Sequence, residues 1–298
     1  YDRLVGSEMC IRDSANIIPW QMAAKKYGLN IKYIKIDDSY NLDLDHLNSL
    51  LTSKTKIVSI VGESNMSGML PNIKDIVSNV KSKSDAIFIL DGAQLVPHRF
   101  VDVQDLGIDF LCVSGHKMLG PTGIGVVWGR KELWDSMDPV YGGGDMIEEV
   151  YYDKATWAPV PHKFEAGTPP FVEAIGLGVA AEYLMNISMS EVQQHSDSLR
   201  EYAKSKLENI DGLNVIHSIS KNAGCTFAMS VEGAHAADIS LMLDTYGVAV
   251  RAGHHCVQPF HRKLKLDATF RATGYIYNNE EDFDTLAYAI ENSIKMLK

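Results

Sequence analysis

The sequence predicts an α/β protein in which a large, doubly wound and mainly parallel sheet precedes a smaller α+β domain. Two observations indicate the sheet. Helical patterns alternate with short apolar runs between residues 17 and 128, and several of these runs are strongly apolar, as in strands buried inside a parallel sheet. Beyond residue 183, short strands enclose a helix, which is typical of a separate α+β unit. We expect the large domain at 15–182 and the small domain at 183–298.

The elements of the large domain follow in chain order from these patterns. Pro19 and Pro71 each stand early in a helical pattern, where proline is tolerated. A glycine-rich turn from Gly120 to Gly125 precedes the last short strand. The expected elements are helices at 17–27, 42–52 and 71–83, and strands at 31–36, 56–61, 86–90, 110–113 and 126–128.

The stretch 141–170 interrupts this alternation with consecutive glycines, several prolines and several aromatic residues. We expect a long ordered loop, and loops of this length are usually functional. The remaining expected elements are helices at 174–185, 190–209, 236–245 and 280–297, and strands at 213–216, 224–231 and 248–251.

Composition excludes several classes of function. The net charge of -10 argues against nucleic acid or an anionic membrane as the main partner, and no apolar stretch approaches the ~20 residues that span a bilayer. No signal-peptide pattern is present. The four cysteines are scattered without a CxxC pair, so we expect neither a disulfide framework nor a zinc site, and a cytoplasmic location.

The first fourteen residues, YDRLVGSEMCIRDS, show no helical or strand periodicity and are not continuous with the pattern that begins at Ala15. They are similar to translated adapter sequence at the ends of some gene fragments. We therefore expect residues 1–14 to be a non-native segment that precedes an N-terminally truncated large domain.

An acid and a lysine follow two neighbouring strands of the predicted sheet. Asp91 follows the run 86–90, and Lys117 closes the tetrapeptide that follows the run 110–113. Residues at the carboxyl ends of parallel strands face the ligand crevice. Pyridoxal phosphate (PLP) needs such a pair, because a lysine amine forms its Schiff base and a carboxylate keeps its ring nitrogen protonated. An ordinary α/β protein with polar strand ends is the alternative.

Four polar residues nearby extend this hypothesis. Asn65 and Gln94 are candidates to contact the phenolic oxygen of the cofactor, and Ser114 and His116 are candidates to bind its phosphate. Each has a simpler interpretation as a turn, cap or strand-end residue.

Cys256 lies in a loop of glycine, histidine and proline residues, where a neighbouring imidazole can favour a reactive thiolate. Cys112 and Cys225 lie within apolar runs, and we expect both to be inert core residues. A metal site made of His254, His255 and Cys256 is a weaker alternative, because adjacent residues rarely converge on one ion.

Arg271 follows a polar loop and is the third element of the predicted site. A guanidinium at the mouth of an amino-acid site can hold a carboxylate through two parallel hydrogen bonds. The alternative is a surface arginine in a salt bridge.

These motifs resemble the SufS-type (group II) cysteine desulfurases, in the class V aminotransferase branch of the fold-type I PLP enzymes. The resemblance runs from about Ala15 to Lys298. It rests on ANIIPWQM, ESNMSG, DGAQ, SGHKMLGPTGIG, FEAGTP and the more specific RAGHHCVQP.

The resemblance implies a role for each matching residue. Lys117 is the implied Schiff-base lysine and proton shuttle, and Cys256 the residue that takes sulfur from the substrate as a persulfide. Arg271 is implied to bind the substrate carboxylate. The implied cofactor contacts are Asn65, Asp91, Gln94, Ser114, His116 and, toward the cofactor phosphate of a partner subunit, Thr168.

The sequence departs from the family at its start. The family has Glu-His-His-Ala-Asn where this chain has Arg12-Asp13-Ser14-Ala15-Asn16, so Asp13 stands where the family's first histidine stacks on the cofactor ring. The family's upstream Gly-Thr-Thr phosphate loop has no counterpart. We attribute both losses to truncation.

The implied function is an L-cysteine desulfurase that releases L-alanine and supplies sulfur for iron–sulfur cluster assembly. The implied partners are L-cysteine, a second subunit in a homodimer and a SufE- or SufU-like sulfur acceptor. The alternatives are a selenocysteine lyase, a class V aminotransferase or epimerase, and a catalytically impaired fragment or binding protein.

Overall fold

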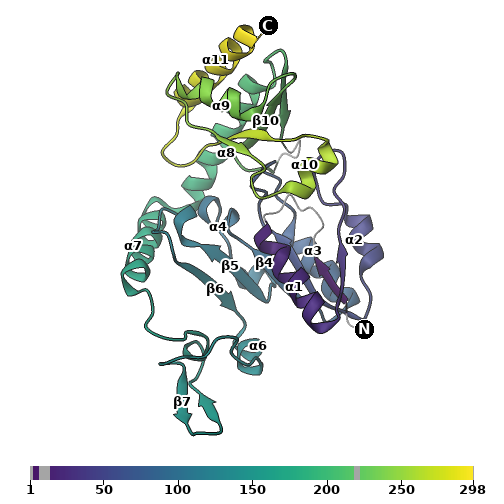
Figure 1. Cartoon of the computed structure of the whole chain (residues 1–298), viewed down its shortest axis with the longest axis vertical. Coiled ribbons are helices and arrows are strands. Elements are labelled where there is room, and N and C mark those ends of the chain that lie inside the picture. Colours follow the sequence, from purple (N-terminus) through teal and green to yellow (C-terminus); the bar gives the residue numbers. More distant parts are fainter. Residues whose placement is uncertain (1–2, 7–13, 218–221, 298) are drawn as a thin grey trace.

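A computed structural model of the chain describes residues 3–6, 14–217 and 222–297, with side chains described from residue 14 onward (Figure 1). It contains a large sheet in the N-terminal half and a small sheet in the C-terminal third. The predicted α/β class is confirmed.

The large sheet has the strand order β2-β1-β3-β4-β5-β6, and all neighbours are parallel except β5 and β6. The mainly parallel sheet is therefore confirmed. The strands are β1 (Arg3–Gly6), β2 (Asn30–Tyr33), β3 (Thr55–Val61), β4 (Ile87–Asp91), β5 (Phe110–Ser114) and β6 (Gly125–Gly129).

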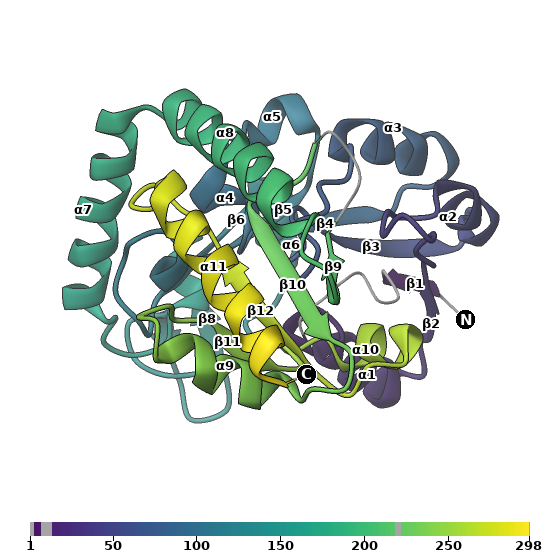
Figure 2. The same ribbon diagram turned by 90° about the horizontal axis from the view of Figure 1, so that it is seen from above.

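Helices lie on both sides of this sheet, with α1 on one face and α3 and α5 on the other (Figure 2). Helix α3 begins after Asn72, whose side chain accepts a hydrogen bond from the backbone N–H of Asp75, and so starts two residues later than predicted. The helices of this half are α1 (Ile18–Tyr27), α2 (Leu44–Leu50), α3 (Ile73–Lys83), α4 (Leu95–His98), α5 (Val103–Leu106) and α6 (Lys131–Ser136).

Residues 3–6 form a strand, although the segment 1–14 shows no strand periodicity in its sequence. Strand β1 pairs in parallel with β2 on one side and β3 on the other. Backbone pairing with two neighbours makes this strand, and its two apolar residues are too few to give a recognisable pattern. The non-native origin of the segment stays a prediction.

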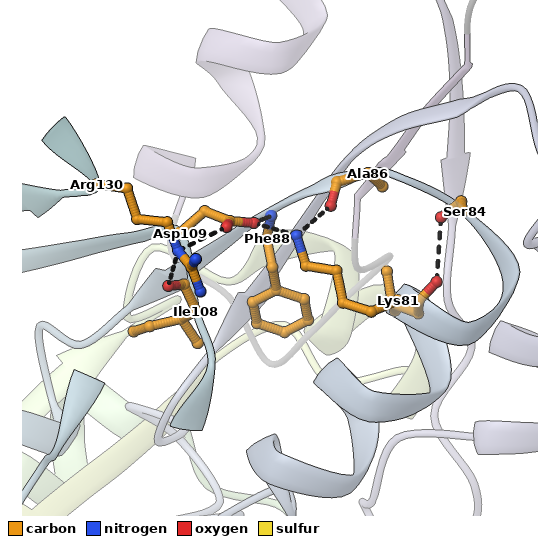
Figure 3. Close-up of polar contacts among 8 residues, drawn as sticks. Lys81, Ser84, Ala86, Phe88, Ile108, Asp109 and Arg130 are labelled. Carbon is orange, nitrogen blue, oxygen red and sulfur yellow. Dashed lines mark hydrogen bonds and ion pairs between the residues drawn. The ribbon is translucent and has the colours of Figure 1, made fainter. Parts of the chain in front are cut away.

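Asp109, directly before β5, links α3, β4 and the connection between β6 and α6 (Figure 3). Its buried carboxylate accepts a hydrogen bond from the backbone N–H of Phe88 in β4 at 2.7 Å and forms ion pairs with Lys81 of α3 and Arg130 beyond β6. Three donors offset the desolvation of one carboxylate, so the charge is tolerated inside the fold.

Two helices lead from the large sheet to the small one. Helices α7 (Phe171–Ile187) and α8 (Met189–Leu207) meet at Ser188 with a bend of 75°. Since α7 runs unbroken through residues 182 and 183, we propose to move the domain boundary to Ser188. No single described helix is long and apolar enough to cross a membrane, and only this bent pair passes that test together, by length and composition.

The small sheet is antiparallel with the order β11-β12-β10-β9, and α8 and α11 contribute buried apolar side chains to the same core cluster as its strands. The prediction missed β12 and α10 and placed β11 about three residues too early. The elements are β9 (Leu213–Ile216), β10 (Thr226–Val231), α9 (Ala236–Asp244), β11 (Arg251–Gly253), α10 (Gln258–Leu264), β12 (Thr269–Thr273) and α11 (Glu280–Leu297).

The predicted loop 141–170 contains an antiparallel hairpin, β7 (Ile147–Val150) and β8 (Ala155–Trp157), that projects away from both sheets at the bottom of Figure 1. The described residues also form 3₁₀ turns at η1 (Ser14–Asn16), η2 (Gly115–Lys117) and η3 (His162–Phe164).

The two halves contact each other through backbone as well as side chains. The backbone N–H of Gly224 donates to the carbonyl of Gly68 at 2.6 Å, and Arg99 pairs with Asp197 of α8. Glu63 lies against this junction with 2% of its surface exposed. Burial raises the pKa of the Glu63 carboxyl to about 8, against the smaller opposing effect of Arg99.

Candidate active site

A cleft of about 570 Å³ lies at the carboxyl ends of β4 and β5, where the small sheet meets the large one. Asp91 ends β4, and Lys117 ends the 3₁₀ turn that follows β5. Both line the cleft. The parallel pairing of β4 with β5 therefore brings together the two residues that the sequence predicts to work as a pair.

Glycine residues allow the tight turns that carry these side chains. A Cβ on Gly92 would lie 2.6 Å from Leu111 Cδ1, and one on Gly115 would lie 2.8 Å from the carbonyl oxygen of Ile124. Neither position has room for a side chain. Glycine at both positions therefore lets the chain pack closely against its neighbours as it leaves each strand. Lys117 is half-buried and lines the cleft.

The predicted phosphate and ring contacts line the same cleft. Ser114 Oγ lies 3.1 Å from His116 Nδ1, and Gln94 lies on the turn after Asp91. Asp91 Oδ1 accepts a hydrogen bond from the backbone N–H of Ala93 at 3.0 Å, which orients its carboxylate.

Asn65 connects the large domain to the cysteine loop. Its side-chain Nδ2 donates to the backbone carbonyl of His255 at 2.9 Å, and its backbone carbonyl accepts a hydrogen bond from Arg271 Nη1 at 2.8 Å. Its Oδ1 is buried and has no hydrogen-bond partner among the described residues. The sequence predicts Asn65 as a cofactor contact and gives no sign of these interdomain bonds.

Cys256 lies on a strained, exposed turn at the edge of the cleft. His255 and Cys256 have φ angles of 49° and 63°, in the left-handed region that non-glycine residues rarely adopt. The thiol is exposed, and its Sγ lies 3.9 Å from Arg251 Nη2. The strain indicates that surrounding contacts hold the thiol in place.

A chain of buried hydrogen bonds supplies those contacts behind the thiol. His255 Nε2 lies 2.9 Å from Thr269 Oγ1, which lies 3.0 Å from His261 Nε2. Burial lowers the pKa of His255 to about 3 and also lowers the pKa of His261, so both imidazoles are neutral at pH 7. Two neutral rings joined through one hydroxyl fix the loop without adding charge beside the thiol.

Two arginines enter the cleft from the small sheet. Arg271 on β12 is opposite Arg251 on β11 in the antiparallel register, and both line the cleft. Burial and the charge of Arg251 lower the pKa of Arg271 from its usual value, and its Nε is buried without a partner among the described residues. Such a pair of cations provides a binding site for an anion such as a carboxylate.

The sequence reasoning missed the contribution of Arg251. It is the first residue of the RAGHHCVQP motif, but its proximity to Cys256 depends on the bend of the chain between them. Asn16 and Trp20 also line the cleft, and Asn16 Oδ1 accepts hydrogen bonds from Trp20 Nε1 and Ser59 Oγ at 2.9 and 2.6 Å.

The two cysteines expected to be inert core residues, Cys112 and Cys225, have different outcomes. Cys112 is half-buried and lines the cleft opposite Asp91 in the β4–β5 register, so it is not a core residue. Cys225 is buried, and burial raises the pKa of its thiol to about 12, in line with an inert role.

Thr168 is exposed in the loop before α7 and is not among the residues that line the cleft, so the structure does not bring it together with the other predicted contacts. Asp13 lies outside the described residues. Within the described ranges, no cluster of three or more His, Cys, Asp or Glu residues could hold a metal ion, and His254, His255 and Cys256 form no such cluster.

Comparison with known proteins gives matches along most of the chain. The family model of class-V aminotransferases matches residues 10–286. A cysteine desulfurase of Haloferax volcanii is 41% identical over 290 residues, which are 97% of this chain and 67% of that protein.

Solved structures agree with this match. The cysteine desulfurase CsdA of Escherichia coli superposes with a TM-score of 0.93 at 34% identity, over 99% of this chain and 72% of that one. The apo cysteine desulfurase of Thermococcus onnurineus gives a TM-score of 0.93 at 32% identity, over 99% of this chain and 73% of that one.

Proposed function

The chain belongs to the class-V aminotransferase family, and we propose that it is a PLP-dependent L-cysteine desulfurase of the SufS type (group II). In this proposal the enzyme removes sulfur from L-cysteine, holds it as a persulfide on Cys256 and releases L-alanine. The observation that carries the proposal is that Cys256, Lys117 and Asp91 line one cleft.

The residues of the cleft fit pyridoxal phosphate. Its volume of about 570 Å³ lies within the range of cofactor pockets. Lys117 and Asp91 provide the amine and the carboxylate, and Ser114 and His116 provide donors for a phosphate. Asn65 and Gln94 supply amides for the phenolic oxygen, and Thr168 is proposed to reach the phosphate bound by a partner subunit. The bound cofactor supplies an electron sink for the amino-acid carbon.

We assign binding and proton transfer to the surrounding side chains. Arg271 binds the carboxylate of L-cysteine, since its guanidinium is held by the Asn65 carbonyl and its Nε has no hydrogen-bond partner within the described part of the chain. Lys117 Nζ moves a proton between positions on the substrate. Asp91, oriented by the Ala93 N–H, keeps a proton on the ring nitrogen.

Cys256 is the proposed nucleophile. Its thiolate, which lies 3.9 Å from Arg251 Nη2, attacks the sulfur of the bound substrate. A sulfur–sulfur bond forms as the carbon–sulfur bond breaks, and the electron pair of that bond stays with carbon, which is then protonated to give alanine. An aminotransferase or epimerase has no need of this thiol, which is why desulfuration is preferred.

Further proposals concern partners and location. We propose a homodimer, because α7 exposes a row of large apolar side chains that water does not favour: Phe171, Val172, Ile175, Val179, Tyr183 and Met185. A SufE- or SufU-like protein is the proposed sulfur acceptor, and sulfur supply for iron–sulfur clusters the proposed role. The described cysteines are all free, which supports a cytoplasmic location.

The proposal is tested with the purified chain loaded with PLP and given L-cysteine and a reductant. We expect alanine and sulfide in equal amounts. Borohydride reduction should add the mass of the reduced cofactor to the Lys117 peptide, and Lys117→Ala should lose both this adduct and the alanine. Adduct formation on another lysine, or alanine production by Lys117→Ala, would refute the assignment.

A further inference from the structure

Cys256 lies on the wall between two clefts. The first is the cofactor cleft, and the second, also of about 570 Å³, lies between α1 and the start of α10. Arg251, His255 and Cys256 line both. Cys256 is therefore shared by both clefts, and no role for the second cleft follows from cysteine binding.

The second cleft carries positive charge in an acidic protein. Arg251 and Arg262 line it together with His254, and none of its described lining residues is acidic. The chain as a whole has a net charge of -10, so a cleft with two arginines and no acid among its described lining residues is a local exception. Like charges at a cleft attract ligands of opposite sign and raise their local concentration.

We propose that the second cleft admits the sulfur acceptor, and that it selects a thiol flanked by carboxylates. The inference rests on the proposed function, because it starts from a persulfide on Cys256. The acceptor thiolate enters beside Arg262 and attacks the outer sulfur of the persulfide. A new sulfur–sulfur bond forms to the acceptor, the bond to Cys256 Sγ breaks, and Cys256 leaves as a thiolate beside Arg251, so no external oxidant or reductant is needed.

This arrangement separates the two half-reactions in space. L-Cysteine occupies the cofactor cleft with Arg271, while the acceptor approaches from the side of Gln21 and Arg262. Arg262 lines only the second cleft. A change at Arg262 should therefore affect sulfur transfer out of the enzyme and leave sulfur transfer onto Cys256 unchanged.

The test uses an assay of thiol attack that does not require desulfuration. Cys10, Cys112 and Cys225 are replaced by Ser or Ala, so that Cys256 is the only cysteine. Its thiol is then converted to a mixed disulfide with nitrothiobenzoate. Release of the coloured thiolate is then followed with mercaptosuccinate, 2-mercaptoethanol and cysteamine, which are anionic, neutral and cationic. For each thiol, the rate measured with the Arg262→Glu variant is divided by the rate measured with the single-cysteine protein that keeps Arg262. The intrinsic reactivity of the thiol then cancels.

We expect Arg262→Glu to slow mercaptosuccinate about tenfold, to change 2-mercaptoethanol less than about twofold and to accelerate cysteamine. Lys265→Glu is the matched control. It removes a cation at the same end of α10, so the helix-dipole effect is the same, but Lys265 does not line the cleft. Equal ratios for all three thiols, or the same pattern with Lys265→Glu, would overturn the inference.

A second measurement separates this inference from the proposed function. Alanine release in a single turnover, without any acceptor, should be the same for Arg262→Glu and the unchanged chain. A selective loss of alanine release in Arg262→Glu would contradict the inference that L-cysteine and the acceptor use different clefts. If no variant forms alanine while the charge discrimination persists, the proposed function fails and the acidic-thiol selectivity of the cleft stands.

Discussion

Arg251 and Arg271 are directly opposite each other in the β11–β12 pair, and both extend into the cleft that contains Cys256. Their surroundings differ. Arg271 is held by the backbone carbonyl of Asn65, whereas Arg251 is exposed and reaches the Cys256 thiol. The two cations therefore have different proposed tasks, substrate binding for Arg271 and contact with the Cys256 thiol for Arg251.

Replacing each arginine with lysine should separate these tasks. Arg271→Lys keeps the charge but loses the two-pronged contact with a carboxylate, so we expect the KM for L-cysteine to rise about tenfold with little change in kcat. Arg251→Lys should instead lower the rate of Cys256 alkylation near neutral pH, because lysine lacks the terminal Nη2 that lies 3.9 Å from Cys256 Sγ, with the KM for L-cysteine changed less than about twofold. The opposite pattern would exchange the two roles.

Asp91→Asn should leave PLP bound and slow alanine formation by more than about tenfold, equivalent to ~1.4 kcal/mol of activation free energy. An amide does not keep the ring nitrogen protonated. Because Asn retains an oxygen that accepts the Ala93 N–H, the turn itself should survive, which the melting temperature and the cofactor absorbance check. A smaller rate loss with cofactor fully bound would argue against the electron-sink role of Asp91.

Asp109→Ala should destabilise the fold by about 2–4 kcal/mol, because it leaves a backbone N–H and two cations without their buried partner. Asp105→Ala is the matched control. Asp105 also forms a lysine ion pair at 2.5 Å, but its side chain is 61% exposed against 6% for Asp109, so the expected cost is below about 1 kcal/mol. Urea denaturation measures both, and equal losses would contradict the importance of burial.

Glu63 should make stability depend on pH. Folding raises the pKa of this carboxyl from 4.5 to about 8, so between these values the folded state holds a proton that the unfolded state has released. The contribution of Glu63 to stability is therefore full below about pH 4.5 and is lost as the pH rises through about 8.

Glu63→Gln mimics the protonated form and should flatten that part of the curve. It should exceed the unchanged chain in stability by at least about 1 kcal/mol at pH 9 and match it near pH 4.5. Glu208→Gln, at an exposed carboxylate that is 48% accessible, should leave the slope unchanged. Parallel pH curves for Glu63→Gln and the unchanged chain would show that Glu63 is ionised in the fold.

The parts of the site that depend on strand ends could be predicted from the sequence. Asp91 and Lys117 follow uninterrupted apolar runs, and the carboxyl ends of neighbouring parallel strands meet at one edge of the sheet. Cys256 was recognisable because glycine and histidine neighbours do not suit a buried strand.

The parts that depend on long-range pairing could not be predicted. Strands β11 and β12 are made by pairing with each other and with β10, and their short sequences carry little apolar pattern, so the contact of Arg251 with Cys256 was missed. The cleft-facing side of Cys112 was missed for a related reason. An apolar run buried in a parallel sheet does not show which of its residues face a ligand.

The central claim is that Cys256 receives the sulfur, and a cysteine pulse followed by peptide mass spectrometry tests it directly. In the PLP-loaded chain, we expect one additional sulfur on the Cys256 peptide, in an amount equal to the alanine released, and none on the peptides of Cys112 or Cys225. Cys256→Ser should bind PLP and L-cysteine without forming a persulfide. Sulfur on Cys112, which shares the cleft, or full turnover by Cys256→Ser would contradict the account.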